Sequence, residues 1–182
     1  MPNWCENQVT ISNENKKEIT ILAKECRKKY PRLFNLILPE PDWMKTPNHN
    51  GEVPVRKKRG PFKVREFPDG SVDERWYNWC CENWGTKWEI SKFLEHSFDI
   101  KKDYYGYYLD LSFWTAWSPP IPIYKELHSR GYDVYARYIE GGYGYVGEFV
   151  NGKSEEYSFN DKNIPDKFQH RINKLYEEWD KE

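Results

Sequence analysis

The side chains that most often bind metals or attack substrates are few in this chain and lie far apart. It has four cysteines and four histidines in 182 residues. The cysteines form no CxxC pair, and the adjacent residues Cys80 and Cys81 would point in different directions on a helix or a strand. The histidines share no HxxxH spacing. We therefore expect no structural zinc, no iron–sulfur cluster and no other cofactor.

Groups for nucleophilic or acid–base catalysis are equally sparse. Cys5 stands beside Glu6, but no histidine partner is evident for it. The neighbouring carboxylates Glu155 and Glu156 would alternate across a strand and could not act jointly. The glycine-rich run 141–147 lies in a predicted hairpin, so it lacks the strand-to-helix setting of a phosphate-binding loop. These patterns predict a protein that is not an enzyme and has no catalytic residues.

Positive charge gathers in one segment of the chain. Residues 45–65 hold seven basic side chains and a single acid, Glu52. Such a patch suits a phosphate backbone or an acidic protein groove, although a solvated loop would explain the same composition. The candidate binding residues in this segment are Arg56, Lys57, Lys58, Arg59, Lys63 and Arg65.

Tryptophans supply a second candidate site. Nine are present, and the run Trp84-Gly85-Thr86-Lys87-Trp88 contains two of them around a lysine. An aromatic cage with a cationic lysine suits an anionic or planar ligand. In the alternative structural role, the tryptophans attach an insertion to a sheet while Lys87 reaches solvent. The candidate residues of this group are Trp84, Lys87, Trp88, Trp114 and Trp117.

Overall composition limits the possible classes of protein. The net charge is −1 with 31% charged residues, which argues against a general nucleic-acid coat but permits a local basic patch. Aromatic residues make up 18% of the chain and predict an aromatic core. No apolar run approaches the roughly 18 residues of a membrane span, and the polar N-terminus does not resemble a signal peptide. We expect a cytoplasmic protein with reduced thiols and no contact with membranes.

The elements that must position these residues begin with a strand and a helix. Residues 4–11 alternate between apolar and polar side chains, as is typical of a half-buried strand. Asn13 is the predicted N-cap of a helix whose apolar repeat continues to Tyr30, before Pro31 ends it. The next segment, residues 39–70, is rich in proline, glycine and charge, and is predicted to be mostly loop.

Further elements follow this loop. Residues 72–83 are a predicted short helix, and the strong alternation of residues 107–117 predicts a central strand. Ser118 is the predicted cap of the next helix, and Gly131 fits the left-handed position at its end. The remaining predicted elements are a hairpin around Gly141-Gly142, a strand after the Asn151-Gly152 turn and a helix opened by Pro165.

This order predicts an α+β fold, specifically a ferredoxin-like split βαβ sandwich. In it an antiparallel sheet carries its helices on one face, and a large insertion follows the first helix. We expect one domain over residues 1–182, with the insertion at about 39–102. The other face of the sheet is either covered by the insertion or free to stack bases. The alternation places on that face Trp4, Glu6, Gln8, Asp110, Ser112, Trp114, Tyr135 and Arg137.

Four segments resemble the YubB-type ferredoxin-like domain family of phages and conjugative plasmids. They cover most of residues 1–18 and 80–152, whereas residues 91–106 and the basic run at 56–59 match less well. The resemblance implies the fold above and an accessory protein of a mobile element, a class that often acts by blocking host machinery. The segments are Pro2–Asn7, Trp84–Trp88, Thr115–Pro120 and Gly141–Gly147.

The sequence thus predicts a non-enzymatic binding protein of a phage or other mobile element. Its expected role is to inhibit a host defence complex by protein–protein contact, as an anti-CRISPR protein does. The partner would be a host protein or ribonucleoprotein, contacted by the basic insertion and exposed aromatic residues. The alternative is a nucleic-acid- or nucleotide-binding module that uses the basic insertion and the aromatic residues of the sheet. An enzyme acting on a nucleotide at the tryptophans is the third and weakest interpretation.

Overall fold

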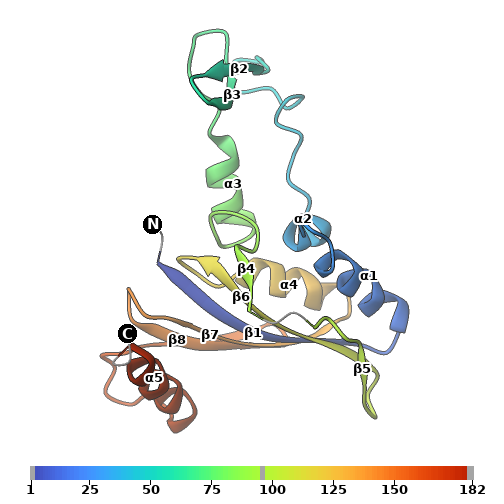
Figure 1. Cartoon of the computed structure of the whole chain (residues 1–182), viewed down its shortest axis with the longest axis vertical. Helices are drawn as coiled ribbons and strands as arrows, with labels where there is room; N and C mark the ends of the chain where they lie inside the picture. The colour runs from blue at the N-terminus through green and yellow to red at the C-terminus, as the bar shows by residue number, and fades with distance from the viewer. Residues whose placement is uncertain (1–2, 95–96, 180–182) are drawn as a thin grey trace.

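The computed structural model describes residues 3–94 and 97–179. They form an α+β protein around an open sheet of seven strands, in which every pair of neighbours is antiparallel (Figure 1). The strand order is β4-β6-β1-β7-β8-β9, and β5 also pairs with β6. The strands are β1 Trp4–Asn13, β4 Lys92–Phe93, β5 Lys101–Lys102, β6 Tyr107–Ala116, β7 Asp133–Glu140, β8 Tyr145–Val150 and β9 Lys153–Ser158.

The first strand lies between β6 and β7, and its predicted alternation is confirmed. Cys5, Val9 and Ile11 are buried, whereas the intervening Gln8 is exposed. The predicted strand over residues 107–117 is confirmed as far as Ala116. Both strands therefore present one apolar face to a common core, which is the reason that they pair at the middle of the sheet.

Helices cover both faces of the sheet, so the expectation of helices on one face is wrong. Residues of α1, α2 and α4 pack with Ala136 and Phe149 in one core. On the opposite face, Ile139 and Val146 pack against Phe168 of α5 (Figure 1). Part of β7 and β8 is apolar on both sides, and α5 buries the second side. The helices are α1 Lys16–Cys26, α2 Leu33–Ile37, α3 Arg75–Asn83, α4 Ile121–Ser129 and α5 Asp166–Trp179.

The ends of α1 differ from the prediction. Asn15, rather than Asn13, is the N-cap, because its side chain accepts a hydrogen bond from the backbone N–H of Lys17 at 3.0 Å. The helix ends at Cys26, and Tyr30 is 76% exposed. The apolar stripe is complete at Cys26, so no packing supports a further turn.

The start of α4 also differs, whereas its end is confirmed. Ser118 does not cap the helix; its hydroxyl donates to the carbonyl of Gly85, and Pro120 occupies the N-cap position. At the other end Gly131 has φ +85°, the predicted left-handed conformation. None of the described helices is long and apolar enough to cross a bilayer.

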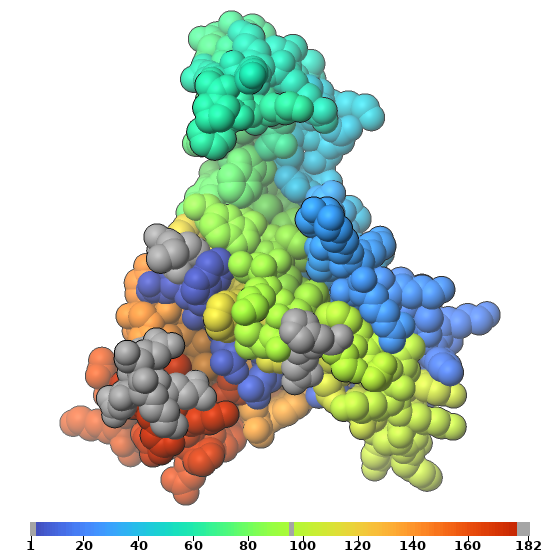
Figure 2. Space-filling model, in the orientation of Figure 1, coloured from blue at the N-terminus to red at the C-terminus, as the bar shows by residue number. Residues whose placement is uncertain are grey.

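Residues 39–74 project from the body of the protein and are called the arm. The loop predicted there contains a two-stranded hairpin, β2 Val55–Arg59 and β3 Phe62–Glu66, which is separate from the main sheet. The hairpin lies at the far end, and α3 leads from it back to the sheet (Figure 1). In the space-filling view the arm stands out as a narrow lobe (Figure 2). After α3 the chain returns to the sheet edge and supplies β4 and β5.

Candidate functional site

The hairpin of the arm gathers cations on one of its faces. In the antiparallel register Arg56 lies opposite Arg65, and Lys58 lies opposite Lys63. Residues that are directly opposite share a face, so all four basic side chains lie together. Like charges in this arrangement destabilise a hairpin, which makes the pattern costly for the fold itself. Within the described residues, Lys58 and Lys63 have no ion pair to offset that cost.

The other face of the hairpin is neutralised internally. Glu66 is 5% exposed and pairs with Lys57 at 2.5 Å and with Arg59 at 2.6 Å. Hydrogen bonds from Lys57 and Arg59 hold the pKa of Glu66 below its ordinary value. The predicted basic residues therefore divide into two groups: Lys57 and Arg59 hold the hairpin together, and the remaining four form a cationic surface.

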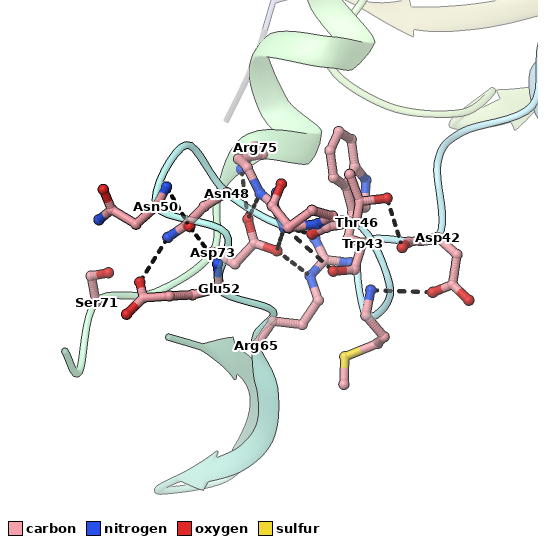
Figure 3. A network of polar contacts seen from close by, with 12 residues as sticks. Asp42, Trp43, Thr46, Asn48, Asn50, Glu52, Arg65, Ser71, Asp73 and Arg75 are labelled. Carbon is pink, nitrogen blue, oxygen red and sulfur yellow. Dashed lines mark hydrogen bonds and ion pairs between the residues drawn. The ribbon is translucent and has the colours of Figure 1, made fainter. Parts of the chain in front are cut away.

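The base of the arm is organised around a single arginine (Figure 3). Arg75 donates to the buried Asp73 and to the carbonyls of Pro47 at 2.8 Å and Thr46 at 2.9 Å. Its guanidinium carbon also lies 5.1 Å from the centroid of the Trp43 ring. The arm has few apolar residues of its own, and this network takes the place of a hydrophobic core.

Burial disfavours the charged form of Asp73, but hydrogen bonds and charge from Arg75, with further charge from Arg65, outweigh it. The pKa of Asp73 is therefore lowered and the side chain is ionised at neutral pH. Because Arg65 lies 3.4 Å from Asp73, the cationic face of the hairpin is tied to the base of the arm. The cations are thus carried on a hairpin that is joined to the base of the arm by an ion pair.

Four tryptophans meet where α3, β1 and β6 come together, and we call this group the tryptophan corner. Trp4 stacks on Trp114 with ring centroids 6.3 Å apart and also contacts Trp88 at 6.5 Å. The ammonium of Lys87 lies 4.8 Å from the ring of Trp88 and 4.9 Å from that of Trp117. Lys87 thus already fills the aromatic cage that these rings form. None of the four cavities found among the described residues is lined by these tryptophans.

Trp84 takes no part in this corner. It is 3% exposed, packs edge-on against Phe34, and donates its ring N–H to the carbonyl of Leu38 at 2.9 Å. Gly85 follows it with φ +76°, and this left-handed turn sends Trp84 and Trp88 in different directions. The sequence predicted the two tryptophans as one group, but one is core and the other is half-exposed.

The segments that carried the family resemblance converge on the tryptophan corner. Trp117 has φ +70°, a rare conformation for a large side chain, and its peptide is held on both sides. Its N–H donates to the carbonyl of Asn3 at 2.9 Å, and its carbonyl accepts from the hydroxyl of Tyr145 at 2.6 Å. Thr86 donates to the carbonyl of Ala116 at 2.8 Å. These hydrogen bonds connect residues of all four motifs, so the motifs contact one another in a single region of the fold.

The second sheet face is partly covered, by α5 and also by residues of the insertion such as Trp88, which contacts Trp4. Arg171 of α5 lies over β1, 3.3 Å from Gln8 and 3.6 Å from Glu6. Sequence reasoning missed Arg171, although it falls between Phe168 and Leu175 on the sheet-facing stripe of the helix. Its spacing from Phe168, three residues, is the signal that would have identified it.

Three of the four thiols are buried, and that of Cys81 is partly exposed. Burial raises the pKa of Cys26 and of Cys80 to about 12, and raises that of Cys5 as well. Within residues 3–94 and 97–179, no cluster of three His, Cys, Asp or Glu side chains is placed to hold a metal ion. His96 lies outside the described residues.

Comparison of the chain with family models, with curated proteins and with solved structures found no match in any of the three.

Proposed function

We propose that this chain is a non-enzymatic binding protein that inserts the tip of its arm into an acidic groove of a partner protein. The observation that supports this is the cluster of Arg56, Lys58, Lys63 and Arg65 on one face of a projecting, internally braced hairpin. Among the described residues, Arg65 alone of these four has an ion pair, with Asp73. Crowding four cations weakens the hairpin unless an acidic surface receives them. Long-range attraction between such a face and an acidic groove also speeds association.

The apolar residues of the hairpin favour a protein partner over nucleic acid. Phe62 is 70% exposed and Val55 is 52% exposed, and both belong to the face opposite the four cations. A hairpin inserted into a protein groove uses both faces, and an exposed aromatic residue supplies the apolar anchor that such interfaces need. Phosphate contacts alone would leave Phe62 and Val55 in water. Nucleic acid bound to the cations is the alternative function.

A ferredoxin-like arrangement belongs to the same proposal. Strands β6 and β7 flank β1, both run antiparallel to it, and the helix α4 lies between them in the chain. This is a split βαβ unit, and β4 with β5 occupies the place of the neighbouring edge strand. Strands β8 and β9 and the helix α5 are then additions at the other edge.

The role of host-defence inhibitor for a phage or plasmid rests on the resemblance of the four segments alone. In that setting the partner is a protein or ribonucleoprotein of a bacterial host, met in its cytoplasm. The feature of the partner that the arm would recognise is an acidic groove wide enough for two strands.

Capture from bacterial lysate with two charge-reversed variants tests the proposal. The first carries Arg56→Glu, Lys58→Glu and Lys63→Glu, which leaves Arg65 in place at the base of the arm. The control carries Lys17→Glu, Lys24→Glu and Lys125→Glu, exposed lysines of α1 and α4. Both variants change the net charge equally. We expect the arm variant to lose its captured partner and the control to keep it.

Nuclease treatment separates the two classes of partner. A protein that stays bound after treatment supports the proposed function, whereas capture that disappears with the nucleic acid supports the alternative. If the arm variant and the wild type capture the same partner equally well, the hairpin is not the contact surface. Thermal stability of both variants should change little, because exposed charges contribute about 0–1 kcal/mol each.

A further inference from the structure

The uncovered part of the second sheet face is hollowed into two adjoining cavities. One, of about 230 Å³, is enclosed by α5 and the start of β1, and the other, of about 290 Å³, lies over β1, β6 and β7. Gln8 lines both, so they meet at the middle strand. Together they have the dimensions of a small-molecule site, and they lie well away from the hairpin of the arm (Figure 1).

Two arginines approach each other across the junction of the cavities. Arg137 lies directly opposite Gln8 in the sheet, and Arg171 reaches Gln8 from α5. Arg171 is largely buried, with 14% of its side chain exposed, yet its nearest acid, Glu6, is 3.6 Å away. Arg137 has no ion pair with any described residue and lies over the ring of Tyr135 at 5.1 Å. Among the described residues, the positive charge here is thus balanced only by the long ion pair between Arg171 and Glu6.

Mutual repulsion makes this arrangement unfavourable in the empty protein. Burial lowers the pKa of Arg171; Glu6 opposes that change, and the neighbouring charge of Arg137 adds to it. Charged groups taken out of water require a partner of opposite sign, or they weaken the fold. A ligand that carries two negative charges between the guanidinium groups would remove this cost, and phosphate matches the fork geometry of arginine.

We propose that Arg137 and Arg171 bind the phosphate group of a small phosphorylated ligand on this face. The floor beside them is polar: Ser112 of β6, Gln8 of β1 and Arg137 of β7 lie in a row across the sheet, and Thr10 of β1 lines the same cavity. Ser112 is 8% exposed and lines the second cavity. Hydroxyl and amide groups of this kind suit a sugar, so the ligand class is a sugar phosphate or a nucleoside monophosphate.

Calorimetric titration of the full chain tests this site. The probes are ribose 5-phosphate and adenosine monophosphate, with adenosine as the matched compound that lacks phosphate. We expect saturable binding of at least one of the two phosphates and none of adenosine. The variant Arg137→Gln should weaken that binding at least tenfold, whereas Lys58→Gln on the arm should leave it unchanged. A short single-stranded oligonucleotide, bound in the same Arg137-dependent way, would identify a polymer as the source of the phosphate.

Thermal unfolding without ligand supplies an independent readout. Because the two arginines repel each other, Arg137→Gln should unfold at the same temperature as the wild type or higher. The proposal is overturned if neither phosphate binds at millimolar concentration, if Arg137→Gln binds as tightly as the wild type, or if that variant unfolds several degrees lower. The last result would assign Arg137 a structural role. None of these outcomes depends on the arm.

Discussion

Replacement of Arg75 by methionine removes the charge that braces the arm. The guanidinium of Arg75 donates to Asp73 and to three backbone carbonyls at 2.8–3.4 Å, and it lies over the ring of Trp43. The side chain of Asp73 is fully buried and would keep only Arg65, at 3.4 Å, as a charged partner. Methionine keeps an unbranched apolar stem, so the substitution mainly removes the guanidinium with its charge and hydrogen bonds.

The size of the effect follows from the loss of one partner of a buried ion pair, which typically costs about 3–5 kcal/mol. Arg75 is one quarter exposed, so the lower part of that range applies, about 3–4 kcal/mol. All these contacts lie between the arm and the first residue of α3. We therefore expect local opening of the arm rather than global unfolding, with amide exchange faster by about 10²- to 10³-fold.

Hydrogen exchange measured by segment is the assay. The N–H groups of Phe67 and Asp73, which donate within the arm, should exchange much faster in the variant, while those of β1 keep their protection. Arg56→Met is the matched control, because Arg56 is an exposed arginine outside the network. Unchanged protection of the arm would refute the idea that Arg75 replaces a core. Equal loss of protection in β1 would show instead that the arm and the body unfold together.

Two further predictions concern the tryptophans and the response to acid. Trp84→Ala should lower the free energy of unfolding by about 3–5 kcal/mol in denaturant titrations, and Trp88→Ala by less, because only Trp84 is in the core. Equal losses in the two variants would contradict the assignment of Trp84 to the core and of Trp88 to the half-exposed corner. The lowered pKa of Asp73 stabilises the arm fully above about pH 3.9, the unfolded value, and this stability is lost as the pH falls through the lower folded value. Exchange protection of the arm should therefore be equal at pH 7 and pH 5 and should fall below pH 4 before that of β1; a parallel loss in both would argue against this linkage.

Strands with one apolar face were predictable from the sequence. The alternation of β1 and β6 and the Asn151-Gly152 turn each specify a local conformation, and the structure has all three. The hairpin of the arm was not predicted, because charged residues dominate its strands and its few apolar side chains, Val55, Phe62 and Val64, are exposed or half-exposed.

The grouping of candidate residues was less predictable, because it depends on register and on turns. Trp84 and Trp88 are four residues apart, but the positive φ of Gly85 separates them, whereas Trp4 and Trp114 are distant in sequence and stack. The helix α5 packs on Ile139 and Val146, whose side chains face away from the main core. A pattern read strand by strand does not show that two such residues become neighbours across a sheet.

The contacts that order the arm lie within the arm and at its base, so the arm can change in sequence independently of the body. The order of the arm depends on Arg75, Asp73 and Glu66 rather than on the core beneath the sheet. Substitutions at the tip, at Lys58 or Phe62 for example, would change the proposed contact surface without disturbing any residue on which the body relies. A lineage under pressure from a changing partner can therefore explore new specificities at the tip while the scaffold remains constant.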